Sequence, residues 1–161
     1  MRILTTVAAV LLATPLMAQT MPEPKTATFI NAEGAEIGTA EIRPAADGIL
    51  ISVDVSGLPD GPLGFHIHEN GVCEGNFESA GGHYNPDDAT HGYFSENGPH
   101  AGDMPNQPVD ADGNMMVEVM NPMIGFDEVS GKAIMIHDGA DDYMTDPSGD
   151  AGGRFACAVI E

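Results

Sequence analysis

The chain has 161 residues, of which 25 are acidic and 5 basic, giving a formal net charge of −20 at pH 7. So negative a protein repels nucleic acids and anionic membranes, and we therefore expect neither as a partner. The length suits one domain, and no interior stretch is apolar enough to span a bilayer.

Residues 1–18 have the pattern of a secretory signal peptide. Met1-Arg2 is a short positive start, Ile3–Leu16 is an apolar segment, and Met17-Ala18 precedes an expected cleavage at Gln19. The apolar segment is shorter than the roughly 20 residues of a membrane span; an uncleaved anchor is the alternative. Cleavage removes one basic residue and no acidic one, so the net charge changes from −20 to −21. We expect a periplasmic or otherwise secreted protein that is not attached to the membrane after cleavage.

The folded domain is expected to occupy residues 27–161, after a disordered lead-in over residues 19–26 that contains Pro22 and Pro24. Short segments rich in apolar residues then recur between turn residues. The predicted strands are Thr26–Asn31, Ile37–Ile42, Gly48–Val55, Leu63–Glu69, Asn114–Met120, Gly131–His137 and Gly153–Ile160. No segment shows a sustained apolar period of 3.6 residues, so the pattern predicts an all-β sandwich or barrel.

Two connections are too long to be hairpin turns. One runs from about Asn70 to Pro108, and the other runs from Asp138 to Gly152. Long loops on a compact β scaffold are usually functional or disordered. The first contains three histidines and Asp103, so we interpret it as a loop that a metal ion orders.

All six histidines lie in segments that could supply metal ligands. His66 and His68 are two residues apart in an apolar run, which places both rings on one face of a strand. Two neighbouring imidazoles are half of a transition-metal site. His100 and Asp103 add a second short spacing. Taken alone, a histidine such as His137 is better interpreted as a core or turn residue, so the hypothesis depends on the full set.

Two ligand sets can be drawn, and they share one residue. The all-imidazole set, which suits Cu(II), is His66, His68, His83 and His137. The set of three imidazoles and one carboxylate, a closed combination that structural zinc prefers, is His83, His91, His100 and Asp103. The spacing alone does not divide the ligands between the sets.

Cys73 and Cys157 are the two cysteines of the chain. In a secreted protein, two cysteines favour one disulfide. Two thiolate metal ligands are the alternative, which the lack of a Cys-x-x-Cys spacing makes weaker.

The chain closely resembles the copper/zinc superoxide dismutases, especially the periplasmic bacterial type. The matching segments, in the order of the family, are Gly64–Gly71, Gly81–Pro86, His91-Gly92, His100–Asp103, His137–Asp142 and Gly152–Ile160. The resemblance implies an eight-stranded antiparallel Greek-key sandwich or flattened barrel with two long functional loops. It also implies one copper ion and one zinc ion per chain, with superoxide as the substrate.

The resemblance assigns roles to individual residues. It implies that the all-imidazole set binds copper, that the second set binds zinc, and that His83 is a bridging, catalytic ligand. Asp141 would link a ligand of each metal, Arg154 would dock the anion, and the two cysteines would form the family disulfide. Taken alone, Arg154 would be a surface cation and Asp141 part of a solvated acidic loop. The implied reaction converts superoxide to oxygen and hydrogen peroxide as copper is alternately reduced and reoxidised, with zinc structural.

The chain departs from the family pattern in the loop after His137. Better-known members carry lysines there, whereas residues 138–153 contain five aspartates and no lysine. We expect an active enzyme that attracts its substrate weakly, with a rate that rises or stays flat as salt is added. A metal-binding protein without catalysis and a zinc hydrolase are the alternative functions. A homodimer is compatible with the sequence but is not readable from it.

Overall fold

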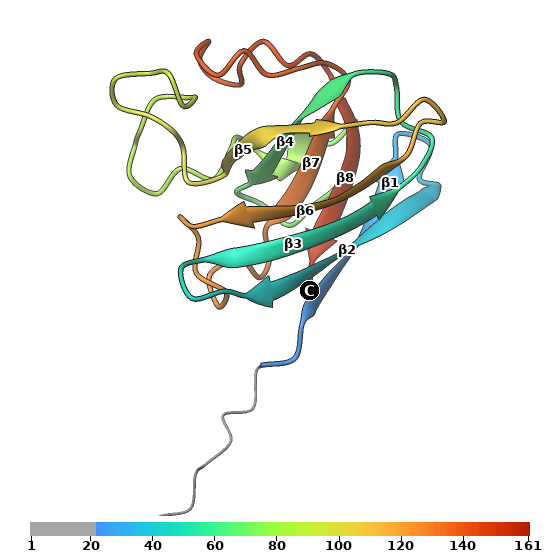
Figure 1. Ribbon diagram of the computed structural model, residues 1–161, viewed down its shortest axis with the longest axis horizontal. Coiled ribbons are helices and arrows are strands. Elements are labelled where there is room, and N and C mark those ends of the chain that lie inside the picture. Colours follow the sequence, from blue (N-terminus) through green and yellow to red (C-terminus); the bar gives the residue numbers. More distant parts are fainter. Residues whose placement is uncertain (1–21) are drawn as a thin grey trace, which may run out of the picture.

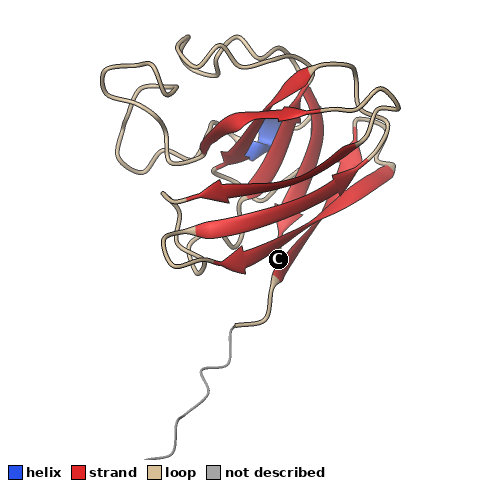
Figure 2. Ribbon diagram, in the orientation of Figure 1, coloured by secondary structure: helices blue, strands red, loops and turns tan. Residues whose placement is uncertain are grey.

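The computed structural model describes residues 22–161, so the expected signal peptide lies outside the described residues. Within this range the fold is all-β, as predicted, apart from one short 3-10 helix at Glu78–Ala80 (Figure 2). The strands are β1 (Lys25–Asn31), β2 (Glu36–Pro44), β3 (Ile49–Val55), β4 (Pro62–His68), β5 (Asp103–Pro108), β6 (Met115–Asn121), β7 (Ala133–His137) and β8 (Arg154–Ile160).

The eight strands form one antiparallel sheet in the order β5-β4-β7-β8-β1-β2-β3-β6. The sheet curls until its two edge strands, β5 and β6, approach each other, which gives a nearly closed barrel (Figure 1). The connections from β3 to β4 and from β6 to β7 join strands that are not neighbours, and this is the Greek-key pattern. The predicted architecture is confirmed.

The core lies inside the barrel and is built from alternate residues of the strands. On β3, Ile49, Ile51, Val53 and Val55 are buried, as their alternation in the sequence predicts. Phe65 on β4 and Ile134 on β7 join the same cluster.

Strands β4 and β7 are buried on both faces. Every residue of β7 is buried, and on β4 only Pro62 is exposed. Both long loops lie on this side of the barrel, beside β5, β4 and β7 (Figure 1). Outward-pointing side chains of these two strands therefore lie beneath the loops instead of meeting solvent.

Two boundaries differ from the predictions. The first long loop was expected to continue to Pro108, but its last part is the edge strand β5. Pro105 and Pro108 hide this strand in the sequence, and an edge position tolerates them because few ladder bonds are needed there. In addition, β1 begins at Lys25, one residue before the predicted strand Thr26–Asn31. No helix within residues 22–161 is long and apolar enough to cross a membrane.

The two cysteines form a disulfide with a Cα–Cα distance of 5.8 Å. The bond ties the first long loop, at Cys73, to the middle of β8, at Cys157. The alternative of two thiolate metal ligands is therefore wrong.

Candidate metal centre

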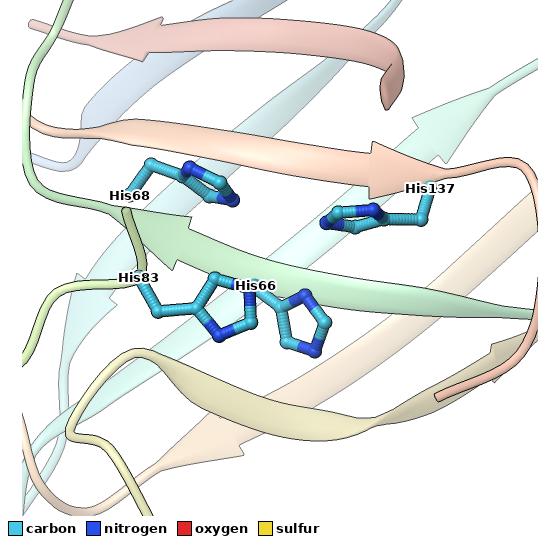
Figure 3. Close-up of side chains that lie close together, drawn as sticks. All are labelled: His66, His68, His83 and His137. Atoms are coloured by element: carbon cyan, nitrogen blue, oxygen red, sulfur yellow. The ribbon is translucent and has the colours of Figure 1, made fainter. Parts of the chain in front are cut away.

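The four histidines of the all-imidazole set meet on the outer side of β4, as Figure 3 shows. His66 and His68 come from β4, His137 ends β7, and His83 comes from the first long loop. The loop is held beside β4 by a bridge between the backbones of His68 and His83. The ring centroid of His83 lies 4.0 Å from that of His66 and 5.0 Å from that of His68. All four residues are buried.

The second set lies next to the first. One donor atom from each of its members lies within 4.8 Å of the others, and these members are His83, His91, His100 and Asp103. Asp103 is the first residue of β5. Its carboxylate lies 2.8 Å from His83 Nδ1, 3.1 Å from His91 Nδ1 and 3.3 Å from His100 Nδ1. The structure therefore brings together both sets that the sequence suggested, with His83 in each.

The donor nitrogens of the first set fit a bound cation. His66 Nδ1, His68 Nε2, His83 Nε2 and both ring nitrogens of His137 are buried without a hydrogen-bond partner. A buried polar atom without a partner costs free energy, and a coordinated metal ion would remove that cost. The remaining nitrogens of His66 and His68 are bonded, to Asp141 and to the Gly81 carbonyl. Fixing one nitrogen in this way orients the other toward a metal.

Burial lowers the pKa of every histidine of the first set, His83 included, and so favours the uncharged form. Burial lowers the pKa of His66 to about 3, that of His68 to about 2 and that of His137 to about 4. Neutral imidazole is the form that binds metal ions, so the environment keeps these rings ready for ligation.

Asp141 connects the two sets. Its Oδ2 accepts a hydrogen bond from His66 Nε2 at 2.8 Å, and its Oδ1 accepts one from His91 Nε2 at 2.9 Å. Burial acts to raise the pKa of Asp141, but the hydrogen bonds from His66 and His91 outweigh it, and the pKa falls below its ordinary value. An ionised carboxylate thus contacts one histidine of each set.

Arg154 forms part of the wall of a cleft of about 530 Å³ that is also lined by His68, His83 and His137. Its guanidinium donates to the carbonyl of Phe77 and, at 2.6 Å, to the carbonyl of Gly81. The Gly81 carbonyl also accepts from His68 Nδ1 at 3.0 Å. One backbone carbonyl therefore positions both a candidate metal ligand and the arginine.

Most of the aspartates in residues 138–153 hold the loop in shape. Asp138 accepts from the Gly153 amide at 2.7 Å, and Asp146 accepts from the His91 amide at 2.7 Å. Asp142 accepts from the amides of residues 144 and 145. The sequence showed the charge of this loop but not these backbone contacts, which depend on how the loop turns back on itself.

Sequence reasoning missed one residue beside the site. Asn106 on β5 exchanges two hydrogen bonds with the backbone of Asp141, each of 2.8 Å. An isolated asparagine in a segment without apolar alternation carries no signal of such a contact.

Comparison with known proteins places these features in a family. The family model described as copper/zinc superoxide dismutase matches residues 36–160. Superoxide dismutase [Cu-Zn] 2 of Aquifex aeolicus is 46% identical over 144 residues, which cover 83% of this chain and 84% of that protein. Superoxide dismutase-like protein YojM of Bacillus subtilis is 41% identical, covering 82% and 73%. The structure of Cu/Zn superoxide dismutase from Brucella abortus has a TM-score of 0.77 and 35% identity, covering 86% of this chain and all of that one.

Proposed function

The chain belongs to the copper/zinc superoxide dismutase family of oxidoreductases, and from this premise we propose that it converts superoxide to oxygen and hydrogen peroxide in the cleft beside Arg154. We assign one copper ion per chain to the all-imidazole set and one zinc ion to the set that contains Asp103. The observation that carries this proposal is the group of buried, unpartnered histidine nitrogens that opens into a cleft lined by an arginine.

Copper, when bound, would supply the one-electron couple that the reaction requires, and zinc would supply fixed charge without changing its redox state. His83 supports this division because its two ring nitrogens face different sets. Its Nδ1 lies 2.8 Å from Asp103, whereas its Nε2 is buried without a partner. We propose that His83 is the shared ligand and that its Nε2 holds a proton for the product.

Arg154 is proposed to hold the superoxide anion. A guanidinium has five N–H donors and stays charged at any working pH. Two carbonyls fix its orientation, which leaves other donors free for paired hydrogen bonds to a small anion. No other basic residue lines the cleft among the described residues.

We also propose a periplasmic or otherwise secreted location. The N-terminal pattern of residues 1–18 supports it, as does the Cys73–Cys157 disulfide, because such bonds persist in oxidising compartments. Fractionation of the native cells with an antibody against the chain measures the location. Sedimentation of the purified protein decides between a monomer and a homodimer.

The test of the proposed function is superoxide dismutation by the chain without residues 1–18, after loading with copper and zinc. Fast turnover, one bound ion of each metal per chain and loss of turnover in His137→Ala are expected. Full loading of both metals without turnover would instead favour a metal-binding protein without catalysis. Turnover that survives in His137→Ala would contradict the assigned copper ligands.

A further inference from the structure

Asn106 lies where the ladder between β4 and β5 is interrupted. Leu63 pairs with Gln107 and Phe65 pairs with Met104, so two residues of β5 stand opposite one residue of β4. Such a bulge leaves backbone groups unpaired and redirects a side chain, often next to an active site. Here the backbone amide of Asn106, which makes no ladder bond to β4, donates to the Tyr143 hydroxyl at 2.8 Å.

The side chain of Asn106 pairs with the peptide groups of Asp141. Its Nδ2 donates to the Asp141 carbonyl and its Oδ1 accepts from the Asp141 amide, both at 2.8 Å. A side-chain amide carries one acceptor and two donors, so it can replace the two ladder bonds that a neighbouring strand would make. The backbone of Asp141 is therefore held at both ends, although Asp141 lies in a loop.

We propose that Asn106 is a positioning residue that couples the two metal sites by fixing Asp141. Asn106 belongs to neither ligand set. The Asp141 carboxylate, in contrast, contacts His66 of one set and His91 of the other. A carboxylate that orients two ligands must be held within about 0.5 Å, and the amide pair supplies that constraint. The inference rests on the proposed function, because it needs both sets to bind metal.

The test compares four forms of the full domain: the unaltered chain, Asn106→Ala, Asp141→Ala and the double variant. Three readouts are measured: zinc affinity by competition with a chelator, the absorption bands of Co(II) placed in the zinc set, and the electron paramagnetic resonance of Cu(II) in the copper set. Removal of an outer hydrogen-bond partner typically lowers metal affinity 10–100-fold. We expect about a tenfold loss of zinc affinity in Asn106→Ala, with changes in both spectra.

The double variant separates positioning from general destabilisation. If Asn106 acts through Asp141, adding Asn106→Ala to Asp141→Ala changes neither spectrum further. Asn114→Ala is the matched control, because the Asn114 side chain bonds only Asp110 in an exposed turn, and it should leave all three readouts unchanged. Should Asn106→Ala fail to fold by far-ultraviolet circular dichroism, Asn106→Asp takes its place, since it keeps the acceptor and loses the donor.

Unchanged spectra in Asn106→Ala would overturn the proposal. It would also be overturned if Asn106→Ala shifted the spectra equally in the unaltered chain and in Asp141→Ala. If Asp141→Ala shifts the spectra and Asn106→Ala does not, only the role of Asn106 is lost. If Asp141→Ala itself leaves both spectra unchanged, the ligand assignment of the proposed function fails, and the role of Asn106 fails with it.

Discussion

The two halves of the barrel use the same kind of strand for different purposes. On β3 the side chains alternate, with every second residue buried in the core and the others at least partly exposed. On β4 and β7 the outward side chains are buried as well, because the long loops cover them. Both halves contribute inward side chains to the core, but the half with β4 and β7 also supplies a dry outer surface on which imidazoles can be fixed. The difference shows that loops, more than strands, decide where this fold can place a metal centre.

The largest effect is expected from His83→Ala, because His83 belongs to both ligand sets. This substitution should affect only the half of the barrel that carries the ligand sets, which we call the site half. Loss of an outer partner costs about 10–100-fold in metal affinity or activity, and we expect the loss of a shared ligand to exceed this and to abolish turnover. Activity and metal content are measured together. Far-ultraviolet circular dichroism should show an intact sheet, and an unfolded sheet would argue against two separable halves.

Metal removal makes the site half sensitive to acid. In the metal-free protein the pKa values of His66, His68 and His137 lie at about 3, 2 and 4, below the value of about 6.5 in the unfolded chain. The unfolded state then binds protons that the folded state cannot, so stability falls as the pH drops from about 6.5 toward 4. His91, whose hydrogen bonds to Asp103 and Asp141 overcome the effect of burial and raise its pKa to about 9, contributes a constant amount in that window.

Urea unfolding of the metal-free protein at a series of pH values checks this dependence. The metal-loaded protein is the control, because metal ions compete with protons for the same nitrogens. Stability that is flat or increases between pH 6.5 and 4 in the metal-free protein would contradict the prediction.

The opposite half is tested by Ile51→Ala on β3, where the side chain is fully buried. The cavity should cost about 2–5 kcal/mol of unfolding free energy, measured by urea denaturation. The Co(II) and Cu(II) spectra should stay as they are in the unaltered protein at temperatures where both are folded. Altered spectra would mean that packing in the β3 half of the barrel affects the geometry of the ligand sets.

Within the site half, Arg154→Gln separates substrate binding from metal binding. A hydrogen bond to a charged group contributes about 1.5–3 kcal/mol, so kcat/KM for superoxide should fall by roughly tenfold or more. Copper and zinc contents should not change, since Arg154 belongs to neither ligand set. Loss of metal in this variant would assign Arg154 a structural role.

The smallest expected effect concerns the acidic loop. Asp150 adopts a left-handed conformation, with φ of 52°, which asparagine tolerates. Asp150→Asn therefore removes, with little strain, one negative charge two residues from Ser148 and from Gly152, which line the cleft. We expect a rate increase of less than about twofold at low ionic strength, lost at high salt because the charge is screened. Glu36→Gln, at the exposed start of β2, is the control and should have no effect.

The sequence predicted strand β3 and the placement of His66 and His68 on one face of a strand, because both depend on local pattern. The alternation of Ile49, Ile51 and Val53 reports a strand, and His66-x-His68 reports two rings on one face. Strand β5 was missed because its prolines and polar residues resemble a loop. The contact of Asn106 with Asp141 joins residues 35 positions apart, and no spacing within either segment indicates it.

The disulfide affects when a newly made chain acquires an ordered anion site at Arg154. Cys73 belongs to the same loop as Phe77 and Gly81, whose carbonyls hold Arg154, and Cys157 lies three residues beyond Arg154 on β8. The disulfide therefore links the loop that contains the two carbonyl acceptors of Arg154 to β8, the strand that carries Arg154. A newly synthesised chain with reduced cysteines could fold its sheet and still lack a preorganised anion site. Under the proposed function, we therefore expect anion binding at Arg154 to require oxidation of the two thiols as well as metal loading.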